Sequence, residues 1–173
     1  MTLIAQARLG LHDPHDCTDA TDELTVLHAI YDTLVKREGQ GFVSALARAW
    51  EVSEDASVWT FKLEPDVQFH DGTPCDAAAV AASFERMARE DKGYTLGAPA
   101  VWRQFLGGAT LEVLDPTQLR VTLTAPMADL LDVLEQGFIV APSAFAALDA
   151  GYHGAQIGSG PYRITQISPE RIS

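Results

Sequence analysis

The chain has 173 residues, 47% of them apolar, which is enough for one folded domain with its own core. Twelve Lys and Arg stand against 24 Asp and Glu, giving a formal charge of −12 at pH 7. Such a surface repels phosphate backbones and anionic lipid headgroups, so the charge argues against nucleic acid or a membrane surface as a partner. No apolar run approaches the roughly 18 residues of a membrane span.

Residues 1–13 lack the basic start and long apolar centre of a secretory signal. The chain is therefore either cytoplasmic or an exported one whose leader is not part of this sequence. Cys17 and Cys75 are too few for a disulfide scaffold and lack the C-x-x-C spacing of a zinc site.

The first clear element along the chain is a helix over residues 22–36. We expect a short strand over 3–9 and a polar loop over 11–21 before it. Acidic residues begin the helix and basic residues end it, as the helix dipole favours, and Gly39 and Gly41 follow. Its apolar residues recur at helical spacing: Val26, Leu27, Ile30, Tyr31 and Leu34.

Alternating apolar and polar residues next predict a small antiparallel meander, with strands near 48–52, 58–63 and 67–70. A helix over residues 76–90 is expected to cover one face of it. The apolar stripe of that helix comprises Ala77, Val80, Ala81, Phe84, Met87 and Ala88, and Ser83, Arg86 and Glu90 are expected on the opposite face. We assign Trp50, Trp59, Phe61, Phe69 and Phe84 to the core of this unit.

The rest of the chain contains one further hairpin and short helices. Residues 91–109 are expected to form a loop. Strands around the turn at 115–117 form the hairpin, and helices are predicted over 127–135 and after Pro142. The segment 158–164, "GSGPYRI", reads as a tight turn that leads into a strand.

Two clusters invite a metal or catalytic interpretation. His70, Asp71 and Cys75 lie in "FHDGTPC", but a turn at Asp71-Gly72 and a helix N-cap at Asp76 explain this stretch without a metal, and the structural interpretation is favoured. His12 and His15 stand beside Asp13 and Asp16; we favour a solvated loop there over weak metal capture. No nucleophile elbow, phosphate loop, zinc-protease or dinucleotide motif occurs, so neither an enzyme nor a cofactor is predicted.

Four motifs follow one another along the chain: "LHDP", "AIYDTLV", the long segment from Leu46 to Arg86 with "WTF" and "FHDGTP", and "IGSGPYRI". Their order resembles the start of the family 5 extracellular solute-binding proteins, the peptide- and nickel-binding subunits of bacterial ABC importers. One departure is Asp55-Ala56 in a turn where the family has Asp-Gly. Since Ala is costly at positive φ, this turn is expected to take a different type.

The resemblance implies an α/β fold: part of the first lobe of a two-lobed periplasmic binding protein, with small antiparallel sheets covered by helices. Residues 1–40 would hold the first strand, cleft loop and helix, residues 41–157 the meander-helix-hairpin subdomain, and residues 158–173 the return strand. Family members are much longer, so the second lobe would be absent from this sequence.

The function implied by the resemblance is capture of an oligopeptide, a metal chelate or another small solute outside the cytoplasmic membrane, with delivery to ABC permease subunits. No cofactor and no bound metal are implied. Carried over by position, the cleft-facing residues are Asp19 and Leu24 in one region, and Gln136 and Phe138 in another. Trp102 joins them as an aromatic that can stack on a ligand.

Each of these five residues also has a structural interpretation, since Asp19 can cap or precede the first helix, Gln136 can be solvated, Trp102 can pack under its own loop, and Leu24 and Phe138 can be core. The alternative function is a ligand-sensing or interaction domain of a regulatory protein. An incomplete lobe would expose apolar surface and a sheet edge, so self-association by strand pairing is also expected.

Overall fold

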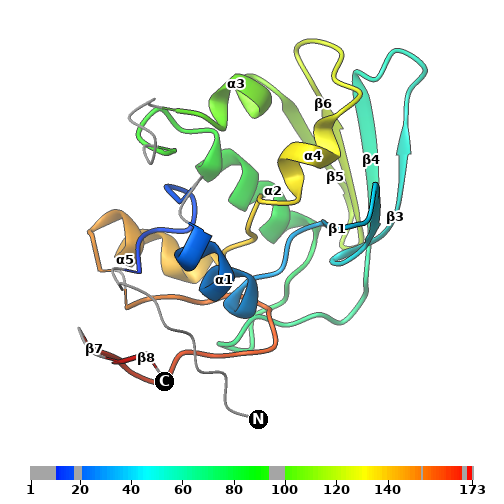
Figure 1. The fold of residues 1–173 in the computed structure, drawn as a ribbon. Coiled ribbons are helices and arrows are strands. Elements are labelled where there is room, and N and C mark those ends of the chain that lie inside the picture. Colours follow the sequence, from blue (N-terminus) through cyan, green and yellow to red (C-terminus); the bar gives the residue numbers. More distant parts are fainter. Residues whose placement is uncertain (1–10, 18–20, 94–99, 153, 169–170, 173) are drawn as a thin grey trace.

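The computed structural model describes residues 11–17, 21–93, 100–152, 154–168 and 171–172 (Figure 1). The strand expected over 3–9 lies outside these residues. A four-stranded antiparallel sheet, one long helix and a group of shorter helices make up the described part (Figure 1).

The sheet has the strand order β3-β4-β6-β5, with β3 (Ala47–Val52), β4 (Val58–Leu63), β5 (Thr110–Asp115) and β6 (Gln118–Thr122). The two predicted hairpins are therefore confirmed, and β4 and β6 join them in the middle of the sheet. Trp59 lies opposite Val121 and Phe61 opposite Leu119, and all four are buried. Their alternation with partly exposed neighbours gives the sheet one core-facing side, as period-two patterning requires.

The strand predicted over 67–70 is wrong. These residues make only an isolated bridge between Gln68 and Pro74. The backbone N–H of Phe69 donates to the carbonyl of Thr73 at 2.9 Å, and that of Cys75 donates to Val67 at 2.9 Å. The segment therefore closes on itself as a turn, and the edge of β4 that it would have paired with is occupied by β6.

Helix α2 (Ala77–Met87) covers the core side of the sheet, as predicted. The carboxylate of Asp76 accepts a hydrogen bond from the N–H of Ala79 at 2.9 Å, which confirms the N-cap. The expected polar face is partly wrong, because Ser83 is 0% and Arg86 3% exposed. A second group of apolar residues lies on that side, so α2 is enclosed from both directions.

Helix α1 (Thr21–Ile30) ends six residues before the predicted end at Lys36. Its last turn is stopped by residues distant in sequence, since the N–H groups of Gly160 and Tyr162 donate to the carbonyls of Ile30 and Ala29 at 2.8 and 3.0 Å. The chain then enters β1 (Val35–Glu38), which pairs with β2 (Gly41–Ser44). Gly39, at a φ of +61°, makes the turn between them.

The remaining elements are short. They are α3 (Arg103–Leu106), α4 (Leu130–Leu134), the 3₁₀ turn η1 (Pro142–Ala144), α5 (Phe145–Asp149), β7 (Ile167–Ser168) and β8 (Arg171–Ile172). Helices near 127–135 and after Pro142 are thus confirmed at shorter length, whereas α3 falls where a loop was expected. The strand expected to follow "GSGPY" directly begins only at Ile167.

Two apolar clusters form the core. The sheet core lies between the sheet and α2 and includes Trp59, Phe61, Phe69 and Phe84, as predicted, with Trp50 only partly buried at its margin. The α1 core is built around Leu27, Ile30, Tyr31 and Phe138. Helix α2 separates the two, and the polar residues on its second side face the α1 core.

The turn at Asp55-Ala56 keeps a left-handed residue without a glycine. Ala56 has a φ of +55°, so the expectation of a different turn type is wrong. The turn is held because the carboxylate of Asp55 accepts from the backbone and hydroxyl of Ser57, and the Ala56 carbonyl accepts from the N–H of Met127 at 3.0 Å. Surrounding contacts therefore impose a conformation that disfavours a Cβ.

We expect Ala56→Gly to raise the free energy of unfolding by about 0.5 to 1 kcal/mol, because glycine removes the left-handed strain and loses part of that gain to unfolded-state entropy. Denaturant unfolding measures it. Ala78→Gly is the matched control: Ala78 is exposed within α2, where the same replacement should cost about 1 kcal/mol. If both variants lost the same free energy of unfolding, the proposed strain at Ala56 would be contradicted.

Candidate functional site

The "FHDGTP" and "GSGPY" motifs form one structural joint with the end of α1. The N–H of His70 donates to the carbonyl of Gly158 at 2.9 Å, and His70 Nε2 donates to the carbonyl of Gly160 at 2.8 Å. A Cβ on Gly158 would lie 2.2 Å from the carbonyl oxygen of Ile30, and one on Gly160 would lie 2.6 Å from the carbonyl carbon of Ile30. Glycine is therefore required because two backbones touch.

The other members of the His70 cluster also have structural partners. The Asp71 carboxylate accepts from the N–H of Thr73 at 3.0 Å and from the hydroxyl of Ser143. Burial raises the pKa of the Cys75 thiol to about 12, so this side chain is a neutral apolar group. These contacts support the structural interpretation. Among the residues that the structure describes, no three His, Cys, Asp or Glu side chains converge on a metal site.

The loop with His15 and Asp13 is buried, so the prediction of a solvated loop is wrong for both. Asp13 is 1% exposed and accepts hydrogen bonds from Arg86 Nη1 at 3.0 Å and Lys92 Nζ at 2.8 Å. Asp149 binds the same two cations, at 2.7 Å from Arg86 and 3.2 Å from Lys92. We call Asp13, His15, Arg86, Lys92 and Asp149 the buried ion network.

Charges within this network balance because each is paired. Burial would raise the pKa of Asp13, but hydrogen bonds from Arg86 and Lys92 outweigh it and hold the pKa well below its usual range. Burial, together with the positive charge of Arg86, lowers the pKa of His15 to about 4. Neutral His15 accepts from Arg86 Nη1 at its Nδ1 (2.9 Å) and donates from Nε2 to the carbonyl of Phe138 (3.1 Å).

Phe138 and Leu24 both lie at the α1 core. Phe138 is fully buried, and its ring meets the His28 ring edge-on at 4.9 Å between centroids. Leu24 is half-buried and packs against the same core. Gln136 is half-buried, and its carbonyl accepts from the N–H of Phe138 at 3.0 Å. The structure therefore brings these three predicted residues to the side of the molecule that carries α1.

The other two predicted residues do not join them. Trp102 is 4% exposed and belongs to the sheet core, where its indole N–H has no partner among the described residues. Asp19 lies outside those residues. Ligand contact by any of the five stays a prediction, and for Phe138 and Trp102 it requires a side chain that is now enclosed to become accessible.

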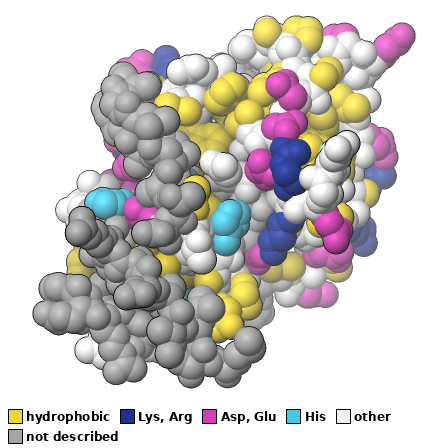
Figure 2. Space-filling view, in the orientation of Figure 1, with side chains coloured by type: hydrophobic (Ala, Val, Ile, Leu, Met, Phe, Trp, Pro, Cys, Tyr) yellow, Lys and Arg dark blue, Asp and Glu magenta, His cyan; other side chains and the backbone are white. Residues whose placement is uncertain are grey.

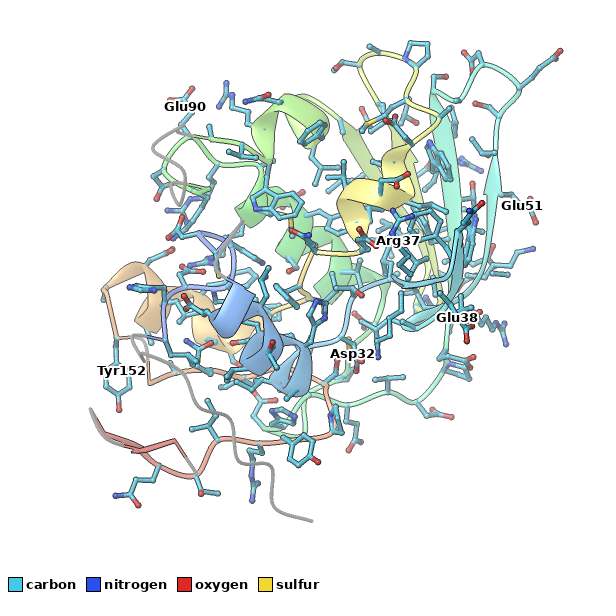
Figure 3. All side chains as sticks on the ribbon, in the orientation of Figure 1. Asp32, Arg37, Glu38, Glu51, Glu90 and Tyr152 are labelled. Carbon is cyan, nitrogen blue, oxygen red and sulfur yellow. The ribbon has the colours of Figure 1, made fainter. Side chains whose placement is uncertain are left out.

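Charged residues beside α1 were missed by the sequence reasoning. Figure 3 shows Asp32 and Arg37 near α1 and α4, and Figure 2, drawn from the same side, shows acidic and basic side chains interleaved there. Lys36 Nζ lies 3.1 Å from Asp32, and Arg37 Nε lies 2.8 Å from Glu135. The sequence pattern predicts that Lys36 and Arg37 end a helix, and no local spacing indicates that Arg37 lies beside Glu135, 98 positions further along the chain.

We call the surface formed by Leu24, His28, Asp32, Lys36, Arg37, Glu135 and Gln136 the α1 face. Burial lowers the pKa of His28, with a further contribution from Lys36. The face thus offers an imidazole that is neutral at pH 7, two cation-carboxylate pairs and an amide. Groups of this kind can hydrogen-bond a small polar solute, and they contain no nucleophile with an activating base.

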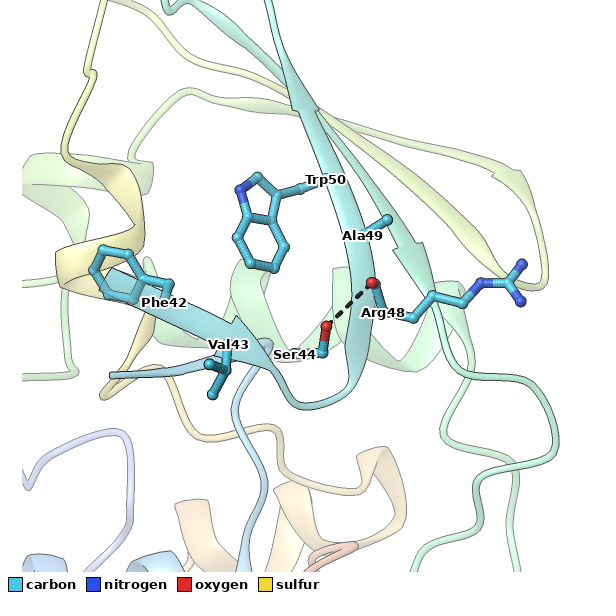
Figure 4. Close-up of a pocket in the computed structure, with 6 residues that line it drawn as sticks. All are labelled: Phe42, Val43, Ser44, Arg48, Ala49 and Trp50. Atoms are coloured by element: carbon cyan, nitrogen blue, oxygen red, sulfur yellow. Dashed lines mark hydrogen bonds between the residues drawn. The ribbon is translucent and has the colours of Figure 1, made fainter. Parts of the chain in front are cut away.

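A separate open pocket of about 430 Å³ lies between the hairpin β1–β2 and β3. It is lined by Phe42, Val43, Ser44, Arg48, Ala49 and Trp50 (Figure 4). The hydroxyl of Ser44 donates to the carbonyl of Arg48 at 3.1 Å across the closed end, and the guanidinium of Arg37 lies 4.6 Å from the centroid of the Phe42 ring. A smaller hollow of about 300 Å³ lies at the start of α2, between Pro74 and Pro142.

None of the described helices is long and apolar enough to cross a membrane.

Residues 41–173 match the family model described as bacterial extracellular solute-binding proteins, family 5 middle. The glutathione-binding protein GsiB of Salmonella paratyphi A is 30% identical over 160 residues, which are 88% of this chain and 29% of that protein. The chain thus spans less than a third of the length of this relative.

Two solved structures show the same architecture. The binding protein AgaA of A. tumefacien R10, in complex with agropinic acid, has a TM-score of 0.75 and 30% identity over 86% of this chain and 30% of its own. The periplasmic binding protein DppA of Helicobacter pylori, associated with an ABC transporter and in complex with the peptide STSA, has a TM-score of 0.69 and 26% identity over 90% of this chain and 34% of its own.

We expect Arg86→Met to lower the free energy of unfolding by about 3 to 5 kcal/mol, because it leaves the buried carboxylate of Asp13 with one cation fewer. Arg89→Met is the matched control: Arg89 binds Asp149 at 2.7 Å from an exposed position, and its loss should cost less than about 1 kcal/mol. Denaturant unfolding compares them, and equal effects would contradict the importance of burial.

Acid should destabilise the fold between pH 6.5 and about 4. The pKa of His15 is about 4 when folded against an ordinary 6.5, so only the unfolded chain binds a proton in this window. The stability present above pH 6.5 is then lost as the pH falls, by about 3 kcal/mol. Across this range, the unfolding free energy of His15→Gln should depend less on pH than that of the unchanged chain. The control is His28→Gln, whose imidazole is only partly buried, and its unfolding free energy should depend on pH more strongly than that of His15→Gln.

Proposed function

This chain belongs to the bacterial extracellular solute-binding proteins of family 5, and we propose that it forms part of the solute-binding lobe of an extracytoplasmic component of an ABC importer. Its relatives are periplasmic or extracytoplasmic substrate-binding proteins of such importers, and the family is not enzymatic. The observation that carries the proposal is the family match over residues 41–173, on the same fold as solved binding proteins.

The proposed solute is peptide-like. Glutathione is a tripeptide, and the DppA structure holds the peptide STSA. The α1 face supports this class because it carries both hydrogen-bond donors and hydrogen-bond acceptors. A short zwitterionic peptide requires both. Lys36 and Arg37 supply positive charge, and Asp32 and Glu135 supply negative charge. A ligand carboxylate can exchange with one of these acidic partners while the cation stays paired.

The proposed mechanism is closure of a second lobe over a solute held on this one. Closure is favoured only if the solute binds the closed state more tightly than the open one, so contacts from both lobes are required. Leu24 and Gln136 are the predicted contacts with exposed surface, and Asp19, Trp102 and Phe138 complete the proposed set. The ABC permease subunits would then receive the closed form.

The rigid support for this face comes from the buried ion network. His15 binds the carbonyl of Phe138, and Ser83 accepts a hydrogen bond from the N–H of Val140 at 3.1 Å. The backbone of segment 138–140 is therefore held by His15 and by Ser83 of α2. Such support keeps Gln136 at a fixed distance from α1, which reduces the entropy lost on binding.

Thermal unfolding of the 173-residue chain tests the proposal, with glutathione, di- to pentapeptides and a nickel–histidine chelate as ligands. A ligand present at about 100 times its Kd should raise Tm by roughly 5 to 10 °C, since it binds only the folded state. Gln136→Ala should reduce the shift, and the control Glu64→Ala, exposed beyond β4, should not. A cooperative transition that no ligand moves would contradict solute binding by this chain.

A further inference from the structure

Neither outer strand of the four-stranded sheet pairs with a further strand among the described residues, although at the start of β3 the N–H of Ala47 donates to the carbonyl of Leu34 and the carbonyl of Arg48 accepts from Ser44. Strand β3 pairs only with β4, and β5 pairs only with β6. Each is six residues long. Free edges of this kind present rows of unpaired N–H and C=O groups that a further strand can occupy. The strand order is β3-β4-β6-β5, and Figure 1 shows β3 on the outer side of β4.

The β3 edge carries the open pocket, and the β5 edge carries exposed apolar side chains. Trp50 and Phe42 give the pocket aromatic walls (Figure 4). On β5, Val113 is 44% and Leu114 38% exposed, and both are among the most exposed large apolar residues described. The β5 edge thus has exposed apolar side chains, and the β3 edge has an open pocket with apolar walls that could receive them.

The apolar side chains of the two edge strands lie on the same face of the sheet. Directly opposite residues in a sheet share a face. Leu111 lies opposite Val121 and Val113 opposite Leu119, so both face the side covered by α2. Trp50 lies opposite Phe61 and Val52 opposite Trp59, so these two take the same side. A β5 strand placed beside a β3 strand would therefore bring its apolar side chains against the aromatic pocket.

Charge favours the same pairing. Arg48 is exposed and, unlike Lys62 and Arg120 on the inner strands, makes no ion pair among the described residues. Strand β5 contributes the carboxylate of Glu112, which is 55% exposed even though it binds Arg120. A register with Glu112 opposite Ala49 brings that carboxylate beside Arg48 and keeps it from lying directly opposite Glu51.

We propose that a second copy of this chain occupies the β3 edge, with its β5 strand paired antiparallel to β3 and its Leu111 and Val113 in the pocket of Trp50 and Phe42. Every neighbouring pair in the sheet is antiparallel, so β5 runs opposite to β3 and the sheet continues from copy to copy without reversal. The contact is head-to-tail and does not close on itself, so it forms chains that lengthen with concentration.

The contact is short. Register shifts between Ala47 and Ala49 and between Val113 and Asp115 interrupt both strands, so with Glu112 opposite Ala49 the regular pairs are Ala49 with Glu112, Trp50 with Leu111 and Glu51 with Thr110. Bulges restrict edge pairing in this way, so the interface belongs to the small, weak class and its formation requires high concentration. Salt should weaken it because Arg48 and Glu112 are exposed.

Sedimentation velocity over roughly 10 μM to 1 mM tests the proposal, a range suited to weak contacts. The unchanged chain should shift from monomer to progressively larger species. Val113→Lys blocks the β5 edge and Val52→Lys blocks the β3 edge; both positions are exposed, so the fold should persist by circular dichroism. Each variant alone should remain monomeric. Tyr152→Lys, at a 67% exposed residue outside the sheet, is the matched control and should associate like the unchanged chain.

An equimolar mixture of the two blocked variants is decisive. Each retains the edge that the other has lost, so the head-to-tail contact predicts a one-to-one dimer and nothing larger. A mixture that stays monomeric while the unchanged chain associates would overturn the pairing of β3 with β5. An unchanged chain that is monomeric throughout, or a Val113→Lys variant that still forms chains, would overturn it as well.

Discussion

The ion pair between Arg86 and Asp13 is the contact on which the two halves of the core depend. Arg86 comes from the second side of α2, and Asp13 comes from the loop that precedes α1. Both are almost fully enclosed, and a charge in such a place is tolerated only when it is paired. Lys92 and Asp149 complete the pairing, so the loop, the end of α2 and α5 are held at one point. Apolar packing alone would specify that junction less exactly, since it is not directional.

A second joint, at the end of α1, gives two of the family motifs a structural role. "FHDGTP" and "GSGPY" bind each other and the last carbonyls of α1. Their His, Asp and Gly residues act as turn and contact residues where backbones approach closely. The residues proposed to contact solute, such as Gln136 and Arg37, belong to none of these motifs. A scaffold that is held in this way can carry different solute contacts without changing its fold.

The α1 face and the sheet edges lie on different parts of the same frame. The α1 face is supported from behind by hydrogen bonds from His15 and Ser83 to segment 138–140. The sheet edges have no such cover among the described residues, and they keep exposed apolar groups at Val52 and Val113. The proposed solute surface and the proposed association surface use different residues, and they are in contact at Arg37, whose guanidinium lies 4.6 Å from the centroid of the Phe42 ring.

The sequence by itself indicated the family through the resemblance of its motifs and their order. It also determined both β-hairpins, the position of α2 with its Asp76 cap, and most of the sheet core, because period-two alternation, helical spacing and capping are local signals. Only the tertiary structure decided where α1 ends, because its last carbonyls are taken by residues near 160. It also decided that Arg86 and His15 are buried, since their partners lie some 70 residues away in the chain or more and no local pattern reports them. Ala56 is a third case: its positive φ contradicts local preference and is imposed by the contacts around it. Local physics fixes the elements, and distant charge pairing and backbone contact decide how they meet.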